Sequence, residues 1–422
     1  MTRRVVVTGM GSVLPDSYSV KKAFHKVAHG QSMIKSISSF DVSDIATKIG
    51  GEILWKDENL EGEQYFDPTY VIEKKELKKL DKFIVYGLYA AHEAIMDSGI
   101  MDSSIDKSDI GVLVGSGIGG ISNIEANANI LSSAGPRKIS PFFLPSVLTN
   151  LLPGQISMKY GFEGQNISVS NACATGTNAI GEGARFIRSG EAKVMIVGGA
   201  EASVSRLSFA GFSALRAMSC ANDNPQTASR PWDKDRDGFV MGEGAGILVL
   251  EDYESAKSRG AKIYAELVSY GFSSDAYHLT APHPEGKGAY SAMKMALKNS
   301  GLDSSKIDYI NAHGTSTPLG DEIEVAAVRR LFGDDASKIS ISSTKSVTGH
   351  LLGASGAVEA VFSIMAMNDN IVPPTINLDN PSESLAGIDL TPLKAKERKL
   401  NTVMSNSFGF GGCNASVIFS KI

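Results

Sequence analysis

The chain has 422 residues, a formal net charge of −5 at pH 7 and three cysteines. Its acidic balance argues against nucleic-acid binding, which demands a broadly basic surface, and apolar runs such as residues 194–197 and 247–250 are far shorter than the roughly 20 residues that cross a bilayer. Because the three cysteines are widely spaced and odd in number, we expect no disulfide framework, no metal site and a reducing, cytoplasmic compartment.

Apolar runs of strand length alternate with segments of helical periodicity along the whole chain. The expected strands are residues 5–8, 110–114, 167–170, 194–197, 245–250, 263–269, 309–311, 339–342, 403–405 and 415–419. The expected helices are residues 74–98, 175–189, 286–300, 321–332 and 353–367. Because the run at residues 5–7 is short and glycines follow at once, we interpret it as a first strand rather than a signal. The alternation predicts an α/β protein with mostly buried sheets.

Two stretches of the chain follow the same plan. Strand 167–170 leads through a turn around Cys173 into a helix rich in small residues, and strand 339–342 leads through residues 345–349 into a second such helix. Glycine and alanine at both helix starts predict close packing of each helix on a sheet. We therefore predict an internal duplication with a junction near residues 251–261 and no flexible linker between the halves.

Cys173 lies in the predicted turn between a strand and a helix. The unpaired N–H groups and positive end of a helix stabilise a thiolate over a thiol, and a sharp turn directs the side chain toward a cavity. Taken alone, a single cysteine is more often a small buried apolar residue. Cys220 and Cys413 lack the strand-to-helix setting, so we expect no catalytic role for either.

Two of the seven histidines also follow predicted strands. His313 comes directly after strand 309–311 and precedes a run of glycine and hydroxyl residues, and His350 ends the segment between strand 339–342 and the next helix. Cys173, His313 and His350 therefore all lie beyond the carboxyl end of a strand, where α/β sheets gather their sites. One cysteine with one histidine would suit a hydrolase. A second histidine favours another task, donation to a carbonyl oxygen that becomes an enolate.

Two glycine-rich loops follow predicted strands. The backbone N–H groups of residues 406–414 are suited to polarise a thioester oxygen, with Phe408 or Phe410 lining an apolar channel. Residues 115–120 superficially suit a nucleotide, but no acidic residue follows at the distance that a dinucleotide-binding unit requires. We therefore expect no nucleotide cofactor.

Five motifs together resemble the β-ketoacyl-acyl carrier protein synthases, most closely the type II elongating enzymes. They are residues 171–176, 230–233, 237–244, 311–317 and 345–350, and the resemblance runs from residues 5–11 to residues 406–414. The resemblance implies a duplicated thiolase-like fold, layered αβαβα, in a homodimer that needs no cofactor. It places the nucleophilic cysteine in a half spanning residues 1–256 and both histidines in a half spanning residues 257–422.

The resemblance also implies the reaction. Cys173 would take an acyl chain from a carrier-protein thioester, and malonyl-acyl carrier protein would then lose carbon dioxide while His313 and His350 hold its thioester oxygen. The resulting carbanion would attack the acyl group, giving a 3-oxoacyl chain two carbons longer in fatty acid elongation. This is physically reasonable, because two imidazole donors in a dry pocket stabilise the developing negative charge far better than water does.

Further site residues follow from the same resemblance. The N–H groups of Cys173 and Phe410 resemble an oxyanion hole, and Phe410 and Ile118 match residues that gate the acyl pocket. Thr315 and Thr317 match contacts to the pantetheine arm, and Lys345 and Glu359 match residues that order the site. From their residue types alone, Lys345 and Glu359 would form an ordinary buried ion pair. Cys413 and Asn171 depart from the commonest residues at their motif positions, and we expect only small effects on the loop and on substrate preference.

A run of lysines falls in the predicted helix 74–98. Lys75, Lys78, Lys79 and Lys82 would share one helical face, with Lys74 beside them. A charge run is usually only a solvated face, but in an acidic protein with an acidic carrier it fits a steering surface. The resemblance assigns carrier docking to Lys75, Lys78, Lys79, Arg137, Lys138 and Arg216.

Several rival functions differ in the residues they need. A thiolase would show a second catalytic cysteine and an initiating synthase one histidine with an asparagine, so the histidine pair disfavours both. A non-catalytic chain-length factor would lack the nucleophile, and a cysteine hydrolase would leave His350 without a role. A polyketide ketosynthase and a type I elongating synthase share all these residues and stay open, as does the preferred chain length.

Overall fold

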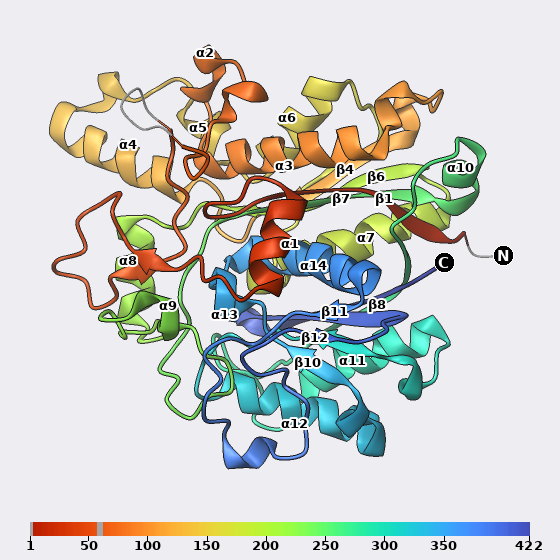
Figure 1. Ribbon diagram of the computed structural model, residues 1–422. Coiled ribbons are helices and arrows are strands. Elements are labelled where there is room, and N and C mark those ends of the chain that lie inside the picture. The colour runs from red at the N-terminus through yellow and green to blue at the C-terminus, as the bar shows by residue number, and fades with distance from the viewer. Residues whose placement is uncertain (1–2, 57–61) are drawn as a thin grey trace.

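The computed structural model in Figure 1 describes residues 3–56 and 62–422. Its principal strands are β1 (Val5–Val13), β4 (Ile110–Gly115), β5 (Asn166–Ile167), β6 (Val194–Glu201), β7 (Gly244–Asp252), β8 (Ala265–Ser274), β9 (Tyr309–Asn311), β10 (Ser340–Ser342), β13 (Thr402–Gly409) and β14 (Cys413–Ser420). Its longer helices are α3 (Lys82–Ser98), α4 (Ile121–Ala134), α6 (Leu151–Tyr160), α7 (Thr175–Ser189), α11 (Lys287–Ser300), α12 (Gly320–Phe332) and α14 (Ser355–Asp369).

Short elements connect these. They are the helices α1 (Val20–Ala28), α2 (Lys74–Leu77), α5 (Phe143–Val147), α8 (Arg206–Ala214), α9 (Pro225–Ala228), α10 (Tyr253–Ser258) and α13 (Lys345–Thr348), and the two-stranded pairs β2 (Lys35–Ser36) with β3 (Ile49–Gly50) and β11 (Ile371–Val372) with β12 (Lys396–Glu397). The predicted α/β class is therefore confirmed, and most predicted elements differ from the observed ones only at their ends. The exception among the strands is 167–170, of which only Ile167 is paired, in β5.

The strand order repeats itself between the two halves of the chain. The first set runs β5-β4-β6-β7-β1 and the second β10-β9-β13-β14-β8. Numbered along the chain within its own set, each order reads third, second, fourth, fifth, first. In each set the first three strands of that order are parallel, the fourth is antiparallel to both of its neighbours, and the fifth therefore runs in the direction of the first three. This confirms the predicted duplication. The boundaries that we gave to the halves stay a prediction.

The two sets of strands form separate layers with helices outside and between them (Figure 1). Helices α3 and α6 cover the outer face of the first set, and α11 and α12 cover the outer face of the second. Helices α7 and α14 lie in the middle and contact strands of both sets. The two sets join through only two residue pairs of β1 with β8, at Val6 and Val7. The result is the αβαβα layering that we expected.

The middle layer depends on small residues. A Cβ on Gly176 of α7 would lie 2.6 Å from the backbone nitrogen of Ala357 in α14, and one on Gly356 would lie 2.0 Å from Oγ1 of Thr177. Neither distance is possible, so only glycine permits this helix crossing. The glycines that we expected to bring each helix onto a sheet therefore also bring the two helices together. This contact sets the start of α7 beside the start of α14.

The predicted helix 74–98 is wrong as a single element. It divides into α2 and α3, because the side chain of Asp81 accepts a hydrogen bond from the N–H of Phe83 (3.2 Å) and caps a new helix there. Asp81 also accepts from the N–H of Asn123 (3.0 Å), which fixes the break against α4. Among the described residues, no helix is both long and apolar enough to cross a bilayer.

Candidate active site

Cys173 lies in a single 3₁₀ turn (Ala172–Ala174) directly before α7. Ala172 has a left-handed backbone (φ +47°), which costs on the order of 1–3 kcal/mol for a residue with a side chain. Thr175 fixes this turn, because its hydroxyl donates to the carbonyl of Ala172 (2.7 Å) and accepts from the N–H of Asn171 (2.8 Å). The turn holds the Cys173 side chain at the end of the helix.

The second half repeats this turn. Residues Leu352–Ala354 form a 3₁₀ turn directly before α14, and Leu352 has the same left-handed φ of +47° as Ala172. His350 lies just before it, where its N–H donates to the carbonyl of Val240 (2.7 Å) and its carbonyl accepts from the N–H of Gly242 (2.9 Å). Backbone hydrogen bonds on both sides therefore fix the position of His350.

His313 follows β9 and is fixed by a carboxylate. Both oxygens of Glu324 in α12 accept backbone hydrogen bonds, from the N–H of His313 (2.9 Å) and from that of Gly314 (2.8 Å). Asn406 in β13 donates from Nδ2 to the same carboxylate (3.3 Å). The loop that carries His313 is thus tied to two neighbouring elements.

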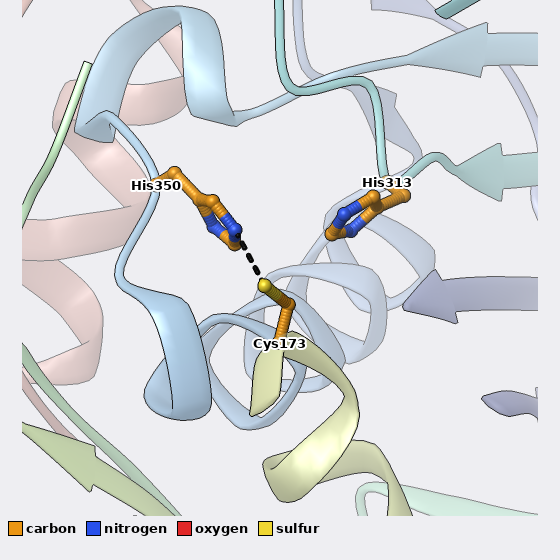
Figure 2. A group of neighbouring side chains, drawn as sticks. All are labelled: Cys173, His313 and His350. Carbon is orange, nitrogen blue, oxygen red and sulfur yellow. Dashed lines mark hydrogen bonds between the residues drawn. The ribbon is translucent and has the colours of Figure 1, made fainter. Parts of the chain in front are cut away.

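The three predicted side chains converge. Nε2 of His350 lies 3.0 Å from Sγ of Cys173, and the rings of His313 and His350 meet edge to face with their centroids 5.3 Å apart (Figure 2). The Cys173 sulfur and one ring nitrogen of each histidine all lie within 4.8 Å of one another. Figure 2 shows Cys173 at the start of a helix, with the two histidines on separate loops facing it.

This convergence is also close enough for a metal ion. The ammonium of Lys345 acts electrostatically on all three side chains, and its positive charge opposes a second cation there. Our expectation that the site works without a metal stays a prediction.

The three side chains are almost fully buried, although they line a cavity. Burial raises the pKa of Cys173 to about 12, although the charge of Lys345 and the N–H groups of Phe410 and Cys173 act to lower it. Our expectation of a thiolate at the start of the helix is therefore wrong for the resting protein, because the cost of desolvating the charged sulfur outweighs the favourable interactions there. Burial, and then the charge of Lys345, lower the pKa of both His313 and His350 well below the usual value. At neutral pH the site holds a thiol and two neutral imidazoles.

A cavity of about 580 Å³ leads to these side chains. Of the predicted site residues its lining includes Cys173, His313 and His350, with Phe408, Phe410, Ile118, Thr315, Thr317 and Arg216, but not Arg137 or Lys138. The hydroxyls of Thr315 and Thr317 lie 3.1 Å apart. Ile118 also borders a second cavity of about 360 Å³, which is lined mainly by apolar residues of α8. Ile118 shares this position with Phe212 and Leu215, which also line both cavities.

Lys345 and Glu359 form an ion pair beneath the site, between α13 and α14. Both side chains are almost fully buried. Burial raises the pKa of Glu359 to about 7, in spite of the opposing effect of Lys345. One oxygen of Glu359 has no hydrogen-bond partner among the described residues. The pair places a positive charge near both histidines.

The predicted docking lysines do not share one helical face. Lys75 lies in α2 and pairs with Glu73 (2.8 Å), and Lys79 lies beyond α2, where it pairs with Glu76 (2.8 Å). Lys78 is exposed, and no carboxylate of the described chain lies within ion-pair distance of it. Three further predicted docking residues, Arg137, Lys138 and Arg216, are also exposed.

Three buried residues at the site were not predicted from the sequence. Glu324 holds His313 as described, and Glu201 accepts from the N–H groups of Gly117 (2.8 Å), Ile118 (3.2 Å) and Gly353 (2.9 Å). Ser355 lies with its Oγ 2.9 Å from Nδ1 of His350. The only signal that the sequence offered was an acidic or hydroxyl residue in a segment expected to be buried.

The fold and the side chains of Cys173, His313 and His350 define a condensing enzyme of the ketosynthase class. The chain belongs to the β-ketoacyl synthase family: the family model for the N-terminal domain matches residues 2–256 and that for the C-terminal domain matches residues 264–379. This membership excludes the cysteine hydrolase.

Relatives cover the whole chain. It is 51% identical to the 3-oxoacyl-[acyl-carrier-protein] synthase 2 of Rhizobium meliloti (99% of each chain) and 49% identical to that of Vibrio harveyi (100% of this chain, 99% of the relative). Its structure matches a type II polyketide ketosynthase in complex with its acyl-carrier protein (TM-score 0.91, 31% identity) and a β-ketoacyl synthase from Burkholderia phymatum (TM-score 0.90, 34% identity), each with full coverage of both chains.

Proposed function

We propose that this protein is an elongating condensing enzyme of type II fatty acid synthesis, a 3-oxoacyl-acyl carrier protein synthase. It joins malonyl-acyl carrier protein to an acyl group carried on Cys173. The observation that carries the proposal is the convergence of Cys173, His313 and His350 in the lining of one cavity. Fatty acid elongation is favoured over polyketide synthesis because the chain is 51% identical to a 3-oxoacyl synthase 2 but 31% identical to the polyketide ketosynthase.

The first half-reaction transfers the acyl group. The Cys173 sulfur bonds to the thioester carbonyl carbon, the bond from that carbon to the carrier sulfur breaks, and the thiol proton leaves with the carrier thiol. The N–H groups of Cys173 and Phe410 hold the carbonyl oxygen in this step, and their effect on the pKa of the Cys173 thiol supports this role. Two such donors stabilise the negative oxygen of the tetrahedral intermediate.

The second half-reaction makes the new bond. Malonyl-acyl carrier protein loses carbon dioxide, and the electron pair moves onto its thioester oxygen, where His313 and His350 donate hydrogen bonds. The carbanion then attacks the acyl carbon, the bond to the Cys173 sulfur breaks, and the thiolate takes up one proton. Neutral imidazoles suit this role, because the low pKa of both groups keeps them uncharged at neutral pH.

The remaining predicted residues serve the substrate and its carrier. Thr315 and Thr317 lie on the cavity wall and hold the pantetheine arm, while Ile118 and Phe410 gate the acyl pocket. Lys345 and Glu359 order the site from below. The carrier docks on basic residues that are exposed or, in the case of Lys79, half-buried, and of these only Arg216 lines the cavity: Lys75, Lys78, Lys79, Arg137, Lys138 and Arg216.

We further propose a homodimer in a cytoplasmic compartment. Large apolar side chains are exposed along α4 and around α5: Ile124, Ile130, Leu131, Phe142, Leu144 and Leu148. Monomeric proteins rarely expose so many together, so a second copy of this chain covers them. The three cysteines are free, as a reducing compartment requires.

Mass spectrometry of the intact protein tests the function. After incubation with acyl-acyl carrier protein, the adduct should lie on Cys173, and malonyl-acyl carrier protein should then release a product two carbons longer. An adduct on Cys220 or Cys413, or none, contradicts the proposal. A product extended by several malonyl units without reduction would instead support the polyketide alternative.

A further inference from the structure

Ser355 is the first residue of α14 and lies against the far side of the His350 ring from Cys173. Its Oγ is 2.9 Å from Nδ1 of His350, while Nε2 of the same ring is 3.0 Å from Sγ of Cys173. The Ser355 side chain is buried, at 1% exposure. Among the described residues, Nδ1 of His350 is its only hydrogen-bond partner.

This single contact distinguishes the two forms of a neutral imidazole. If Nδ1 carried the proton, it would donate to the Ser355 oxygen, and the buried hydroxyl hydrogen would have no acceptor among the described residues. If Nε2 carries the proton, the Ser355 hydroxyl donates to Nδ1 and Nε2–H points at the Cys173 sulfur. In the second arrangement the Ser355 hydroxyl and the His350 ring N–H both have a partner, and the only donor at this contact left without an acceptor is the weak S–H of Cys173.

The repeated turn in the first half gives an independent comparison. Thr175 holds the place of Ser355 there, as the first residue of the helix that follows the 3₁₀ turn. The Thr175 hydroxyl bonds to the backbone of its own turn, at Ala172 and Asn171. The Ser355 hydroxyl makes no such bond within the described chain and is directed to His350 instead. A structural role in the turn therefore does not account for Ser355.

We propose that Ser355 is a positioning residue that holds His350 with its proton on Nε2. His350 then acts as a hydrogen-bond donor to the malonyl thioester oxygen and not as the base that deprotonates Cys173. The tautomer of a histidine is set by the partner of its other ring nitrogen. This inference rests on the proposed function, because it assigns His350 to the decarboxylation step and leaves the thiol proton to depart with the carrier thiol.

Variants of Ser355 in the full chain separate the two half-reactions. Ser355→Ala should slow release of carbon dioxide from malonyl-acyl carrier protein about tenfold. Deleting an oxyanion donor outright slows a reaction about 10²–10³-fold, and the effect here should be smaller because a fraction of His350 keeps the Nε2–H form. Acylation of Cys173 should change less than about twofold, because that step uses backbone donors. Ser355→Thr keeps the hydroxyl and should restore decarboxylation, whereas Ser355→Val, which has the shape of threonine, should resemble alanine.

Nitrogen-15 NMR spectra of histidine-labelled protein show which ring nitrogen of His350 carries the proton. A purely structural role of Ser355 would leave this proton position unchanged in the variants. The His350 proton should be coupled to Nε2 in the unaltered protein and in Ser355→Thr, and should be shared between both nitrogens in Ser355→Ala. A proton on Nδ1 in the unaltered protein overturns the inference, as do threonine and valine variants with equal decarboxylation rates. If the unaltered protein forms no Cys173 adduct and releases no carbon dioxide, the proposed function fails. If it does both but the variants slow both steps alike, only the Ser355 inference fails.

Discussion

The sulfur of Cys173 lies 3.0 Å from Nε2 of His350, although the two residues are 177 positions apart in the chain. Cys173 lies in the turn before α7 and His350 just before the matching turn that precedes α14, and those two helices cross through Gly176 and Gly356. The duplicated fold thus brings one loop from each half into contact. Both side chains are buried, and hydrogen bonds and charges act more strongly there than in water.

Replacing the nucleophile should separate condensation from decarboxylation. Cys173→Ala removes the group that carries the acyl chain, so condensation should fall at least about 10³-fold, as expected when a covalent step is lost. Release of carbon dioxide from malonyl-acyl carrier protein should persist, because His313 and His350 remain. Carbon dioxide release and product formation, measured on one preparation, check this, with Cys220→Ala as the control. Loss of both activities in Cys173→Ala with an unchanged melting temperature would contradict separate roles.

Removal of His313 should affect the other half-reaction. His313→Ala deletes one donor to the developing oxyanion, so decarboxylation should slow by about 10²–10³-fold. Acylation of Cys173, which uses the N–H groups of Cys173 and Phe410, should change much less. Rapid-quench measurement of the acyl adduct beside carbon dioxide release tests this split. A variant that loses acylation as strongly as decarboxylation would show that His313 also serves the first step.

The reactivity of Cys173 should follow its raised pKa. Because burial raises the pKa of Cys173 to about 12, the thiolate fraction should grow about tenfold per pH unit from pH 7 to pH 10. Alkylation by iodoacetamide, followed by peptide mass spectrometry, should rise over that range without levelling off. The exposed Cys220 in the same samples serves as the internal control. A plateau for Cys173 below pH 9 would mean that the site stabilises the thiolate.

Breaking the ion pair beneath the site should destabilise the protein. Lys345→Met leaves the Glu359 carboxyl buried without its cation, and such a loss typically removes about 3–5 kcal/mol of unfolding free energy. The double change Lys345→Met with Glu359→Leu leaves no buried charge and should recover part of that loss. Denaturant unfolding of both variants tests this. If the double variant is less stable than the single one, packing around the pair matters more than charge.

Docking of the carrier should depend mainly on Lys78. The exposed Lys78 lacks a neighbouring carboxylate among the described residues, whereas Glu73 and Glu76 already neutralise Lys75 and Lys79. Lys78→Glu, alone or with Lys79→Glu, should raise KM for carrier-bound substrate at low salt, and added salt should reduce the difference.

The matched control for docking is Lys298→Glu, which makes the same charge change at an exposed lysine of α11, on the opposite side of the molecule from α2 (Figure 1). Its KM should stay unchanged. Equal KM values for Lys78→Glu and the unaltered protein at low salt would contradict docking at this site.

Local patterns in the sequence were sufficient for most of the fold. Helix 175–189 was predicted with its observed bounds, because Gly190 takes the left-handed conformation (φ 84°) that ends a helix. Strand 309–311 was also predicted with its bounds. Helix 74–98 was wrong because Asp81 caps a second helix, and this cap is fixed by a contact with Asn123 that the local sequence does not reveal.

The sequence by itself determined the α/β class, the duplication and the choice of Cys173, His313 and His350, since strand-end loops and their motifs are local features. The tertiary structure decided the rest. It decided that Cys173 is a neutral thiol, because desolvation depends on everything packed around the sulfur. It decided that Glu324 bonds to the backbone of His313 and that Ser355 contacts the ring of His350, because a hydrogen bond between distant segments depends on how the layers pack. Residue type and spacing carry no information about either.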